Sequence, residues 1–515
     1  MHAKIFSATT IGVDAKEVQV EVDIALGLIN FFIVGLPDMA IKESRQRIST
    51  ALKNSGIRLP DRKITVNLAP ADLKKEGTLF DLPIAVGILQ ATGLINLEKN
   101  FIEDTLFLGE LSLDGTVRPI KGALAITFDS KEYLNKKRIV LPKENTQEAS
   151  LITDIEIIGI KTLTEFIAYA RKERNIIPTP STWHHLVQQK QQYLIDFSQV
   201  KGQKQAKRAL QIAAAGRHNI LFIGSPGAGK TMLAQRLPTI MPPLTFKEIL
   251  ETSKIYSITG KLSNQQALIY QRPFRAPHHT ISEAGLVGGG TYPQPGEISL
   301  AHNGILFLDE LTEFKRHTLE VLRQPLENKN VSIARANQTI TFPASILLVA
   351  ALNPCPCGFL GDKKRPCTCK QNDIYRYLQK LSGPLLDRID LQIHVQAIDY
   401  DDIKKQPSEN SSEKLYNQIK IALEQQEKRF GPHRFNNSMT TDEVEKYCIL
   451  EDAAENALKQ AFERLSLSMR GYHKILKIGR TIADLDQKET ISLSHIQEAI
   501  TYRSLENTLD KLKTQ

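Results

Sequence analysis

The stretch Asn219-Ile-Leu-Phe-Ile-Gly-Ser-Pro-Gly-Ala-Gly-Lys-Thr231 decides how this chain folds. It begins with an apolar run that predicts a buried strand, and residues 232–237 after it have the character of a helix. The glycine-rich turn between them matches G-x-x-x-x-G-K-[ST] at every fixed position. A chance glycine-rich turn is the alternative, and the flanking strand and helix argue against it. The stretch therefore predicts a phosphate-binding P-loop.

The residue types of this loop suit a nucleoside triphosphate. Glycines let backbone N–H groups surround a phosphate, and the helix that follows adds positive potential at its N-terminus. The Lys230 ammonium would neutralise phosphate charge, and the Thr231 hydroxyl is a ligand for Mg²⁺. We therefore expect ATP and Mg²⁺ to bind at Gly224, Ser225, Pro226, Gly227, Ala228, Gly229, Lys230 and Thr231.

Two more apolar strands end in polar residues further along the chain. Residues 304–308 precede Asp309 and Glu310, and residues 345–352 precede Asn353. An acidic pair at a strand end would hold Mg²⁺ through Asp309 and polarise an attacking water through Glu310. Asn353 would orient that water against the terminal phosphate. The alternatives are an acidic helix cap and an ordinary turn asparagine, and the P-loop disfavours both.

The composition describes a soluble protein of several domains. A length of 515 residues suits about three domains, and 41% apolar residues are ample for packed cores. The formal charge of +9 permits a polyanionic partner without requiring one. We find no apolar run of membrane-spanning length and no secretion signal in the sequence. We expect a cytoplasmic protein that does not enter membranes.

The apolar pattern divides the chain into parts. Residues 1–175 alternate strands and helices, residues 176–198 form a Pro-, His- and Gln-rich linker, and residues 199–399 hold the P-loop core. Residues 400–440 form a polar linker and a connecting helix, and residues 441–515 show only helical periods. The predicted fold class is α/β with an all-helical C-terminal region. Strands are expected at 18–25, 31–35, 64–68, 138–141 and 155–160, and helices at 42–54, 82–91, 203–214, 413–429, 441–450, 451–464, 471–485 and 494–505.

Four of the five cysteines lie close together, as Cys355-Pro-Cys357 and Cys367-Thr-Cys369. Two close pairs of thiols can supply a tetrahedral Zn²⁺ site, and free thiols are the alternative in a reducing compartment. We favour structural zinc, and because all four thiols would be ligands, no position stays open for zinc catalysis. Cys448 is expected in a helix, with its side chain in the hydrophobic core. The loop between the pairs carries basic residues that either meet DNA or form a solvated tip: Lys363, Lys364 and Arg365.

A series of longer motifs resembles one family of proteins. These motifs are GSPGAGKT at 224–231, FRAPHHTISEAGLVGGG at 274–290, PQPGEISLAHNGILFLDE at 293–310, NPCPCG at 353–358, GPLLDRIDL at 383–391 and SMRGYHKILKIGRTIADL at 468–485. They are similar to motifs of the magnesium-chelatase-like AAA+ proteins, and most of all to those of the bacterial YifB/ComM family. The resemblance covers essentially the whole chain.

The resemblance implies a hexameric ring with nucleotide at the subunit interfaces. Arg388, in Leu-Leu-Asp-Arg-Ile-Asp, matches the arginine finger of the family, which reaches the terminal phosphate held by a neighbour. Arg470, in Ser-Met-Arg-Gly, matches the sensor arginine of the helical lid. A guanidinium fork suits phosphate oxygens, and arginine fingers contribute about 10³–10⁵ in rate. The alternative for an isolated arginine is a surface salt bridge.

Two insertions distinguish this AAA+ branch. Residues 284–302 contain a Gly-Gly-Gly and a Pro-Gln-Pro-Gly segment, which indicate a hairpin or loop. Residues 327–340 have two alternating stretches around a polar tip and predict a hairpin. This second insertion resembles the pre-sensor hairpin of replicative MCM helicases. We expect Arg335 and Lys329 to contact DNA phosphates without reading bases, and a solvated hairpin face is the alternative.

The N-terminal part resembles the Lon-protease-like domain without its catalytic pair. Lon-type proteases use a Ser–Lys dyad. In this chain Leu79 stands at the serine position and Leu124 at the lysine position, so no peptidase activity is expected. The resemblance implies a scaffold for a ring and for DNA. Basic residues of this part would line a channel or form a solvated face: Lys42, Arg45, Arg47, Lys53, Arg58, Arg62 and Lys63.

Taken with the resemblance, the residues predict an ATP-driven hexameric DNA motor. It would act on single-stranded and branched DNA and move recombination intermediates, a role that in the family supports natural transformation. One rival is a metal-insertion ATPase, against which the Lon-like part, the cysteines and the basic charge argue. A second rival is a protein unfoldase, whose aromatic pore loop has no counterpart at residues 238–244.

Overall fold

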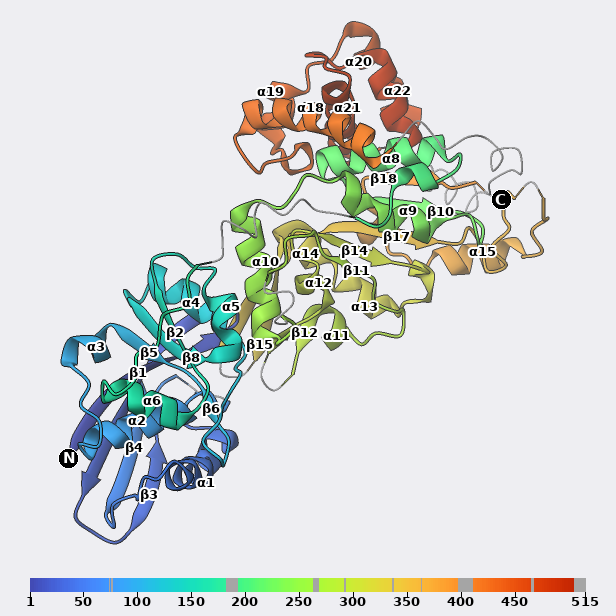
Figure 1. The fold of residues 1–515 in the computed structure, drawn as a ribbon. Coiled ribbons are helices and arrows are strands. Elements are labelled where there is room, and N and C mark those ends of the chain that lie inside the picture. Colours follow the sequence, from blue (N-terminus) through green and yellow to red (C-terminus); the bar gives the residue numbers. More distant parts are fainter. Residues whose placement is uncertain are drawn as a thin grey trace. The chain divides into compact units, whose positions relative to one another are not determined.

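The computed structural model divides the chain into two compact units (Figure 1). Unit 1 contains residues 1–190 and 246–270, and unit 2 contains residues 191–245 and 271–515. The chain therefore passes from one unit to the other three times. The structure describes residues 1–73, 75, 77–181, 193–262, 268–290, 293–335, 338–362, 364–396, 411–464 and 467–503.

Unit 1 contains a four-stranded sheet in the order β1-β2-β4-β3. The long antiparallel pair β1–β2 places Ile5 opposite Val20, and β3 runs parallel to β4 along the edge. Alternating residues in β2 are buried, as its alternating sequence predicts. The almost wholly apolar helix α2 is buried against this sheet. These elements are β1 (His2–Ile11), β2 (Asp14–Ala25), β3 (Asn30–Val34), α1 (Met39–Asn54), β4 (Lys63–Ala69) and α2 (Asp81–Ala91).

A second, parallel sheet of unit 1 has the order β5-β8-β9. Helix α4 packs between this part and α10, a helix that the chain reaches only after the P-loop. Nothing in the sequence indicated that residues 246–270, which follow the P-loop, would pack with the N-terminal part. The elements are α3 (Lys99–Glu103), β5 (Thr105–Phe107), β6 (Glu110–Leu111), β7 (Val117–Arg118), α4 (Ala123–Glu132), β8 (Arg138–Pro142), α5 (Thr146–Ala149), β9 (Glu156–Ile160), α6 (Leu163–Ala170) and α10 (Phe246–Ile258).

Unit 2 is built on a five-stranded sheet in the order β11-β14-β17-β10-β18, in which every pair is parallel. The central strands are buried along their whole length, which is why their sequences are continuous apolar runs. Helix α8 packs beside β10 and β18. The elements are α8 (Lys204–Gly216), β10 (Ile220–Ile223), α9 (Lys230–Arg236), β11 (Phe274–Arg275), β14 (Ile305–Leu308), β17 (Leu347–Leu352), α15 (Gln371–Leu378), α16 (Gly383–Leu386) and β18 (Leu391–His394).

The two predicted insertions are present, with one shifted boundary. The first contains α11 (Glu283–Val287), the short pair β12 (Gly288–Gly289) and β13 (Gln294–Pro295), and α12 (Glu297–Leu300). The second is the hairpin of β15 (Asn330–Arg335) and β16 (Gln338–Pro343), preceded by α13 (Arg316–Glu320) and α14 (Arg323–Asn328). The prediction that the hairpin begins at residue 327 is wrong, because residues 323–328 continue as a helix that ends at left-handed Lys329.

The C-terminal region of unit 2 is helical, as predicted, and its helices lie together in the orange-to-red part of Figure 1. Its apolar faces join the same hydrophobic core as the parallel sheet. Residues 182–192 of the first predicted linker and 400–410 of the second lie outside the described residues. The described helices contain none that is both long and apolar enough to cross a bilayer. The helices are α18 (Ser412–Phe430), α19 (Thr441–Tyr447), α20 (Asp452–Arg464), α21 (Met469–Leu485) and α22 (Leu493–Thr501).

Candidate functional site

The P-loop connects the carboxyl end of β10 to the first turn of α9. A side chain at Gly224 would lie 2.3 Å from the Val395 carbonyl oxygen, and Gly229 has a φ of +87°, so both positions require glycine. The Lys230 Nζ is held inside the loop by the carbonyl oxygens of Gly224 at 2.5 Å and Ser225 at 3.2 Å. Burial lowers the pKa of this ammonium, which is poised to bind an anion in the loop.

The three predicted strand ends meet at the P-loop. Parallel pairing aligns Ile223 with Leu352 and Leu308 with Ala350, so the residues that follow these strands share one edge of the sheet. Thr231 Oγ1 donates to Asp309 Oδ2 at 2.7 Å, and Lys230 Nζ donates to Asn353 Oδ1 at 3.0 Å. A hydroxyl beside a carboxylate is the donor pair that Mg²⁺ takes next to nucleotide phosphates. The residues present therefore fit ATP with Mg²⁺.

Glu310 stands apart from this hydrogen-bonded group. Its side chain is about half exposed, and its carboxylate lies 3.3 Å from Nδ1 of His279. Nothing in the sequence around His279 marks it as a neighbour of Glu310, although the residue belongs to the motif at 274–290. A histidine next to a strand end is not a signal by itself, and only the fold brings residues 279 and 310 together.

Arg388 and Arg470 lie at the amino ends of the parallel strands, whereas the P-loop lies at their carboxyl ends. Arg388 precedes β18, and its backbone carbonyl accepts a hydrogen bond from Asn219, the residue before β10. The four residues of β10 separate this edge from the P-loop by about 13 Å. Both guanidinium groups bind Glu327, at 2.6 Å for Arg388 and 2.5 Å for Arg470. Sequence reasoning missed Glu327, because nothing in a helical Leu-Glu-Asn marks it as the partner of two distant arginines.

A buried ion pair fixes the two arginine-bearing segments together. Asp390 binds Lys474 Nζ at 3.0 Å and the backbone N–H of Asn219 at 3.0 Å, with His218 at 3.7 Å. Burial opposes ionisation, but the charge of Lys474 and the hydrogen bonds from His218 and Lys474 outweigh it and hold the pKa of the Asp390 carboxyl below its usual range. Because Asp390 follows Arg388 closely and Lys474 lies one turn after Arg470 in α21, the pair holds both arginines at one edge.

We expect Asp390→Asn to lower the free energy of unfolding by about 3–5 kcal/mol at neutral pH, because Lys474 would stay buried without its counter-charge. The stabilisation is fully present above the ordinary aspartate pKa of about 3.9 and is lost as the pH falls below it. The wild type should therefore lose stability on acidification more steeply than the variant. Denaturant midpoints at neutral and acidic pH measure this difference. Adding Lys474→Met should restore most of the loss, and a single variant as stable as the wild type would contradict the pairing.

The four clustered cysteines converge as a metal site requires. Their sulfur atoms all lie within 4.8 Å of one another, and Cys355 is 3.3 Å from Cys357 and 3.6 Å from Cys367. A tetrahedral zinc with Zn–S bonds of about 2.3 Å needs S···S separations of about 3.8 Å. Backbone N–H groups of Phe359 and Thr368 lower the pKa of the Cys357 thiol, whereas burial raises that of the Cys355 thiol, so the geometry of the four sulfur atoms is the stronger evidence. The set Cys355, Cys357, Cys367 and Cys369 therefore fits Zn²⁺. Cys448 is buried in the helical region, apart from the cluster.

The cysteine loop contacts the P-loop directly. Ser225 Oγ donates to Asp362 Oδ2 at 2.7 Å, and a side chain at Gly358 would lie 2.6 Å from Pro226 Cδ. The backbone N–H groups of Lys364 and Arg365 also donate to Asp362. The basic loop was predicted to meet DNA or to form a solvated tip, and sequence reasoning missed its acidic residue. A lone Asp in a polar loop gives no signal of its contact with a glycine-rich turn earlier in the chain.

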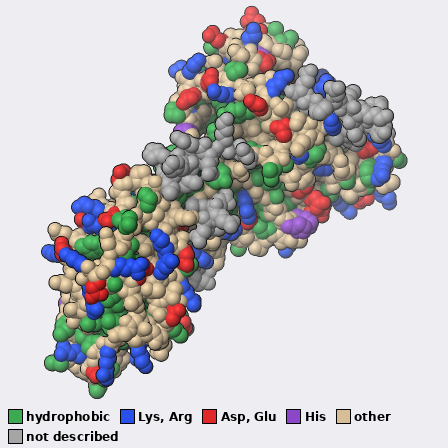
Figure 2. Space-filling model, viewed as in Figure 1, with side chains coloured by type: hydrophobic (Ala, Val, Ile, Leu, Met, Phe, Trp, Pro, Cys, Tyr) green, Lys and Arg blue, Asp and Glu red, His purple; other side chains and the backbone are tan. Residues whose placement is uncertain are grey.

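The structure separates the two DNA-contact candidates. Arg335 ends β15 and pairs with Gln338 across the tip of the hairpin, whereas Lys329 precedes β15 at its base. The six residues of β15 put about 20 Å between them. Lys and Arg side chains are mixed with acidic ones over both units on the face shown in Figure 2. Of the basic residues proposed for a channel in unit 1, Arg47 instead binds Asp81 at 2.8 Å. Burial raises the pKa of the Asp81 carboxyl to about 6.

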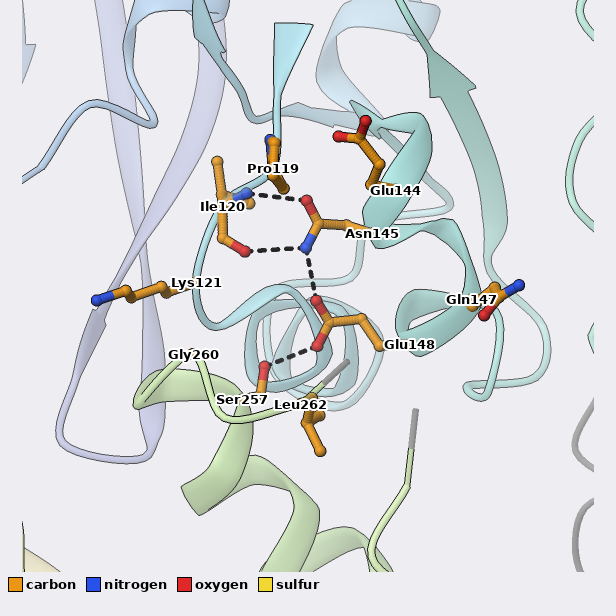
Figure 3. A pocket seen from close by; sticks show the side chains of 10 residues that line it. All are labelled: Pro119, Ile120, Lys121, Glu144, Asn145, Gln147, Glu148, Ser257, Gly260 and Leu262. Carbon is orange, nitrogen blue, oxygen red and sulfur yellow. Dashed lines mark hydrogen bonds between the residues drawn. The ribbon is translucent and has the colours of Figure 1, made fainter. Parts of the chain in front are cut away.

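A pocket of unit 1, of about 400 Å³, lies where the end of α10 meets the rest of that unit (Figure 3). The Asn145 amide exchanges two hydrogen bonds of 2.9 Å with the backbone of Ile120. The Glu148 carboxylate accepts from Asn145 Nδ2 at 2.6 Å and from Ser257 Oγ of α10 at 2.9 Å. On the same helix, Lys254 binds the buried Asp129 at 2.8 Å. The contacts of Ser257 and Lys254 attach α10 to the N-terminal part of unit 1.

The two positions that would carry a Lon-type dyad lie in the interior of unit 1. Leu124 is fully buried in α4, and Leu79 is half-buried before α2. A leucine side chain supplies neither a nucleophile nor a base. The residues at these positions therefore serve packing.

A parallel sheet with a P-loop, acidic and asparagine strand ends at the same edge and an appended helical region define an AAA+-type ATPase. Family models described as "Magnesium chelatase, subunit ChlI", "Subunit ChlI of Mg-chelatase" and "Magnesium chelatase, subunit ChlI C-terminal" match residues 196–403, 20–145 and 409–503. The chain belongs to this magnesium-chelatase ChlI-like family, and membership implies ATP hydrolysis.

Individual proteins confirm the predicted resemblance. The chain is 41% identical over 513 residues to "Competence protein ComM" of Haemophilus influenzae, covering 99% of both chains. It is 40% identical over 512 residues to YifB of Escherichia coli, covering 99% of this chain and 98% of YifB. A shorter match, 33% identical over 129 residues, covers 24% of this chain and 22% of "Lon protease 2" of Bacillus subtilis. The predicted family and fold class are thus confirmed.

Proposed function

We propose that this chain forms a hexameric ring that hydrolyses ATP to move along single-stranded and branched DNA, promoting branch migration while transforming DNA is integrated. The observation that supports the proposal is the placement of Arg388 at the end of the strands opposite the P-loop. If Arg388 acts on the bound nucleotide as an arginine finger, it must act on the nucleotide of a second copy, as in a ring. The ComM relative is a competence protein, which supports DNA uptake as the setting.

In this proposal each group of the chain has one task in hydrolysis. The P-loop N–H groups and Lys230 hold the phosphates, and Thr231 with Asp309 would hold Mg²⁺, which supplies charge neutralisation when bound. Glu310 polarises the attacking water, and Asn353 orients it. Arg388 and Arg470 of the adjacent copy exchange their contact with Glu327 for contacts with the terminal phosphate. Both arginines therefore act between copies, including the one expected from the lid.

The hairpin insertions would transmit this work to DNA. Arg335 ends β15 next to the turn of the β15–β16 hairpin, and a basic residue there can hold a phosphate without reading a base. Lys329, at the base of the same hairpin, would contact DNA only if the strand runs along the hairpin's length. Phosphate contacts of this kind weaken steeply with added salt.

A metal-insertion ATPase is the second candidate, because the matching family models are named after magnesium chelatase. The two candidates differ in what stimulates them. We expect turnover of ATP to rise with single-stranded, duplex or Holliday-type DNA, and this rise to diminish as salt increases. Measured turnover that is the same with and without each DNA, together with no retention of oligonucleotides at low ionic strength, would reject the DNA motor. A gain in a porphyrin-metallation assay would support the chelatase.

We expect Lys230→Ala to abolish ATP hydrolysis and branch migration. The substitution removes the ammonium that three loop and strand-end oxygens hold in place for a phosphate. ATP turnover and movement of a labelled four-way junction measure the two activities. The matched control is Lys420→Ala in α18, an exposed lysine away from the loop, which should keep both. Junction movement retained by Lys230→Ala would remove the motor from the proposal.

A further inference from the structure

Glu327 binds both of the arginines proposed to act between copies, and it does so through one oxygen atom. Its Oε1 accepts from Arg388 Nη2 at 2.6 Å and from Arg470 Nη2 at 2.5 Å. The hydrogen bond from Arg388 and then that from Arg470 hold the pKa of the Glu327 carboxyl below its usual range, so the contact joins full charges. An anionic oxygen between two guanidinium groups is also what a terminal phosphate offers. The Glu327 carboxylate therefore occupies the place of such a phosphate.

The two arginines line a pocket of about 240 Å³, to which helix α21 contributes further cations. Arg470, Lys474 and Lys477 are spaced at i, i+4 and i+7, so they share one face of that helix. The Arg388 side chain is only 9% exposed, and its Nε is buried without a hydrogen-bond partner among the described residues. A phosphate has more acceptor oxygens than a carboxylate, and this unused donor favours it. The acidic side chains of the pocket are Glu327, Asp387 and Asp390.

Glu327 belongs to the base of the β15–β16 hairpin, whereas the arginines are fixed at the amino ends of the strands by the buried ion pair described above. Lys329, two residues after Glu327, ends α14: its N–H donates to the Pro325 carbonyl at 3.0 Å. The Lys329 carbonyl accepts from the Ala344 N–H at 2.8 Å, and Ala344 directly follows β16, so both strands close on Lys329. Antiparallel pairing then continues from this base as far as Arg335. A displacement of the end of α14 is therefore passed to the hairpin.

Nearby cations oppose the position in which Glu327 holds the end of α14. Burial and the charges of Arg217 and Arg434 lower the pKa of the Lys329 ammonium. An ion pair of Arg434 with both oxygens of Glu443, at 2.8 Å each, offsets part of one of these charges. The end of α14 is thus attracted at Glu327 and repelled at Lys329. When a phosphate takes the two arginines, the attraction is lost and Glu327 faces another anion, so both residues favour displacement.

We propose that Glu327 is a positioning residue that couples the nucleotide of the adjacent copy to the β15–β16 hairpin of its own chain. The terminal phosphate of that ATP displaces Glu327 from Arg388 and Arg470, and the released end of α14 shifts the hairpin base. Once the phosphate has left, Glu327 returns to the arginines. This inference rests on the proposed function, because it requires the ring and assigns the hairpin to DNA. Glu327 takes no part in bond making.

Hydrogen exchange of a peptide covering residues 323–335 measures the displacement directly, without DNA. With the non-hydrolysable analogue AMP-PNP, wild-type rings should exchange these amides about tenfold faster than with ADP, because the charged hydrogen bonds of Glu327 are lost. Glu327→Gln should show the fast exchange with both nucleotides. Glu327→Asp keeps the charge and should keep part of the difference. The matched control is Glu424→Gln, at an exposed glutamate of α18, which should behave as the wild type.

Steady-state turnover separates this coupling from a loss of structure. A carboxylate that competes with the terminal phosphate for two arginines raises the KM for ATP, so Glu327→Gln should lower the KM about tenfold without raising kcat. The movement of a four-way junction per ATP hydrolysed should fall, because the hairpin no longer follows the nucleotide. A side chain that only stabilised the fold would give neither change.

The coupling is overturned if wild-type rings exchange residues 323–335 equally with ADP and with AMP-PNP, or if Glu327→Gln leaves the KM unchanged or raises it. Failure of the proposed function has a different signature. The wild type would then move no junction and show no stimulation by any DNA, while the nucleotide-dependent exchange of residues 323–335 would persist. In that case the exchange of Glu327→Gln still decides whether Glu327 holds the base of the hairpin.

Discussion

Replacement of Arg388 by alanine is expected to reduce the kcat for ATP about 10³- to 10⁵-fold, the range that arginine fingers contribute, while ATP binding to the same chain is largely kept. The reason is the separation of Arg388 from its own P-loop by the length of β10. In the proposed ring the residue would stabilise charge on a phosphate held by another copy. Turnover and equilibrium binding of a fluorescent ATP analogue measure the two quantities separately.

Mixing variants tests the division of the site most sharply. Arg388→Ala subunits keep an intact P-loop, and Lys230→Ala subunits keep an intact Arg388. In a ring assembled at random from equal amounts of both, about a quarter of the interfaces combine the two intact halves. We therefore expect two inactive preparations to regain activity on mixing. If the mixture stays inactive although mixed rings form, or if Arg388→Ala alone retains wild-type turnover, Arg388 is no finger between copies.

Contiguous motifs were the part of the site that the sequence predicted. The residues from Gly224 to Thr231 are neighbours in the chain, so their motif can be read directly. The carboxyl end of each buried parallel strand can also be read, because the apolar run stops there at a polar residue. Because parallel strands in one sheet end at the same edge, Asp309 and Asn353 could be placed beside the P-loop before any fold was known. The spacing of the four cysteines likewise allowed a metal site to be predicted, because two close pairs of thiols are typical zinc ligands.

Contacts between distant residues without a motif could not be predicted. Glu327 meets two arginines that lie 61 and 143 residues later in the chain, and its surroundings are those of an ordinary surface helix. The docking of α10 into unit 1 depends on Lys254 and Ser257, which look in the sequence like residues of any amphipathic helix. Such pairs depend on how helices and strands pack against one another in three dimensions, and a single sequence does not show this packing.

The largest expected effect on stability comes from the cysteine cluster. Structural zinc contributes on the order of 10 kcal/mol of folding free energy in small zinc-binding domains, because the ligands are brought together only when the metal is bound. We expect the purified protein to contain zinc, and we expect Cys355→Ser to lose it and to have a lower midpoint of thermal unfolding. The metal content of purified protein and the release of zinc on thiol modification measure the first effect. Cys448→Ala, at a cysteine outside the cluster, should keep its zinc.

Loss of zinc should also weaken ATP binding, through a contact that can be removed on its own. The loop between the cysteine pairs reaches the P-loop where Asp362 accepts from Ser225 and Gly358 packs on Pro226. An unfolded loop would withdraw both contacts from the turn whose N–H groups hold the phosphates. Asp362→Ala should therefore retain zinc yet raise the Kd for ATP, and by less than Cys355→Ser does. If Cys355→Ser binds no zinc but keeps wild-type ATP affinity, the cysteine cluster stabilises its own loop and has no part in shaping the nucleotide site.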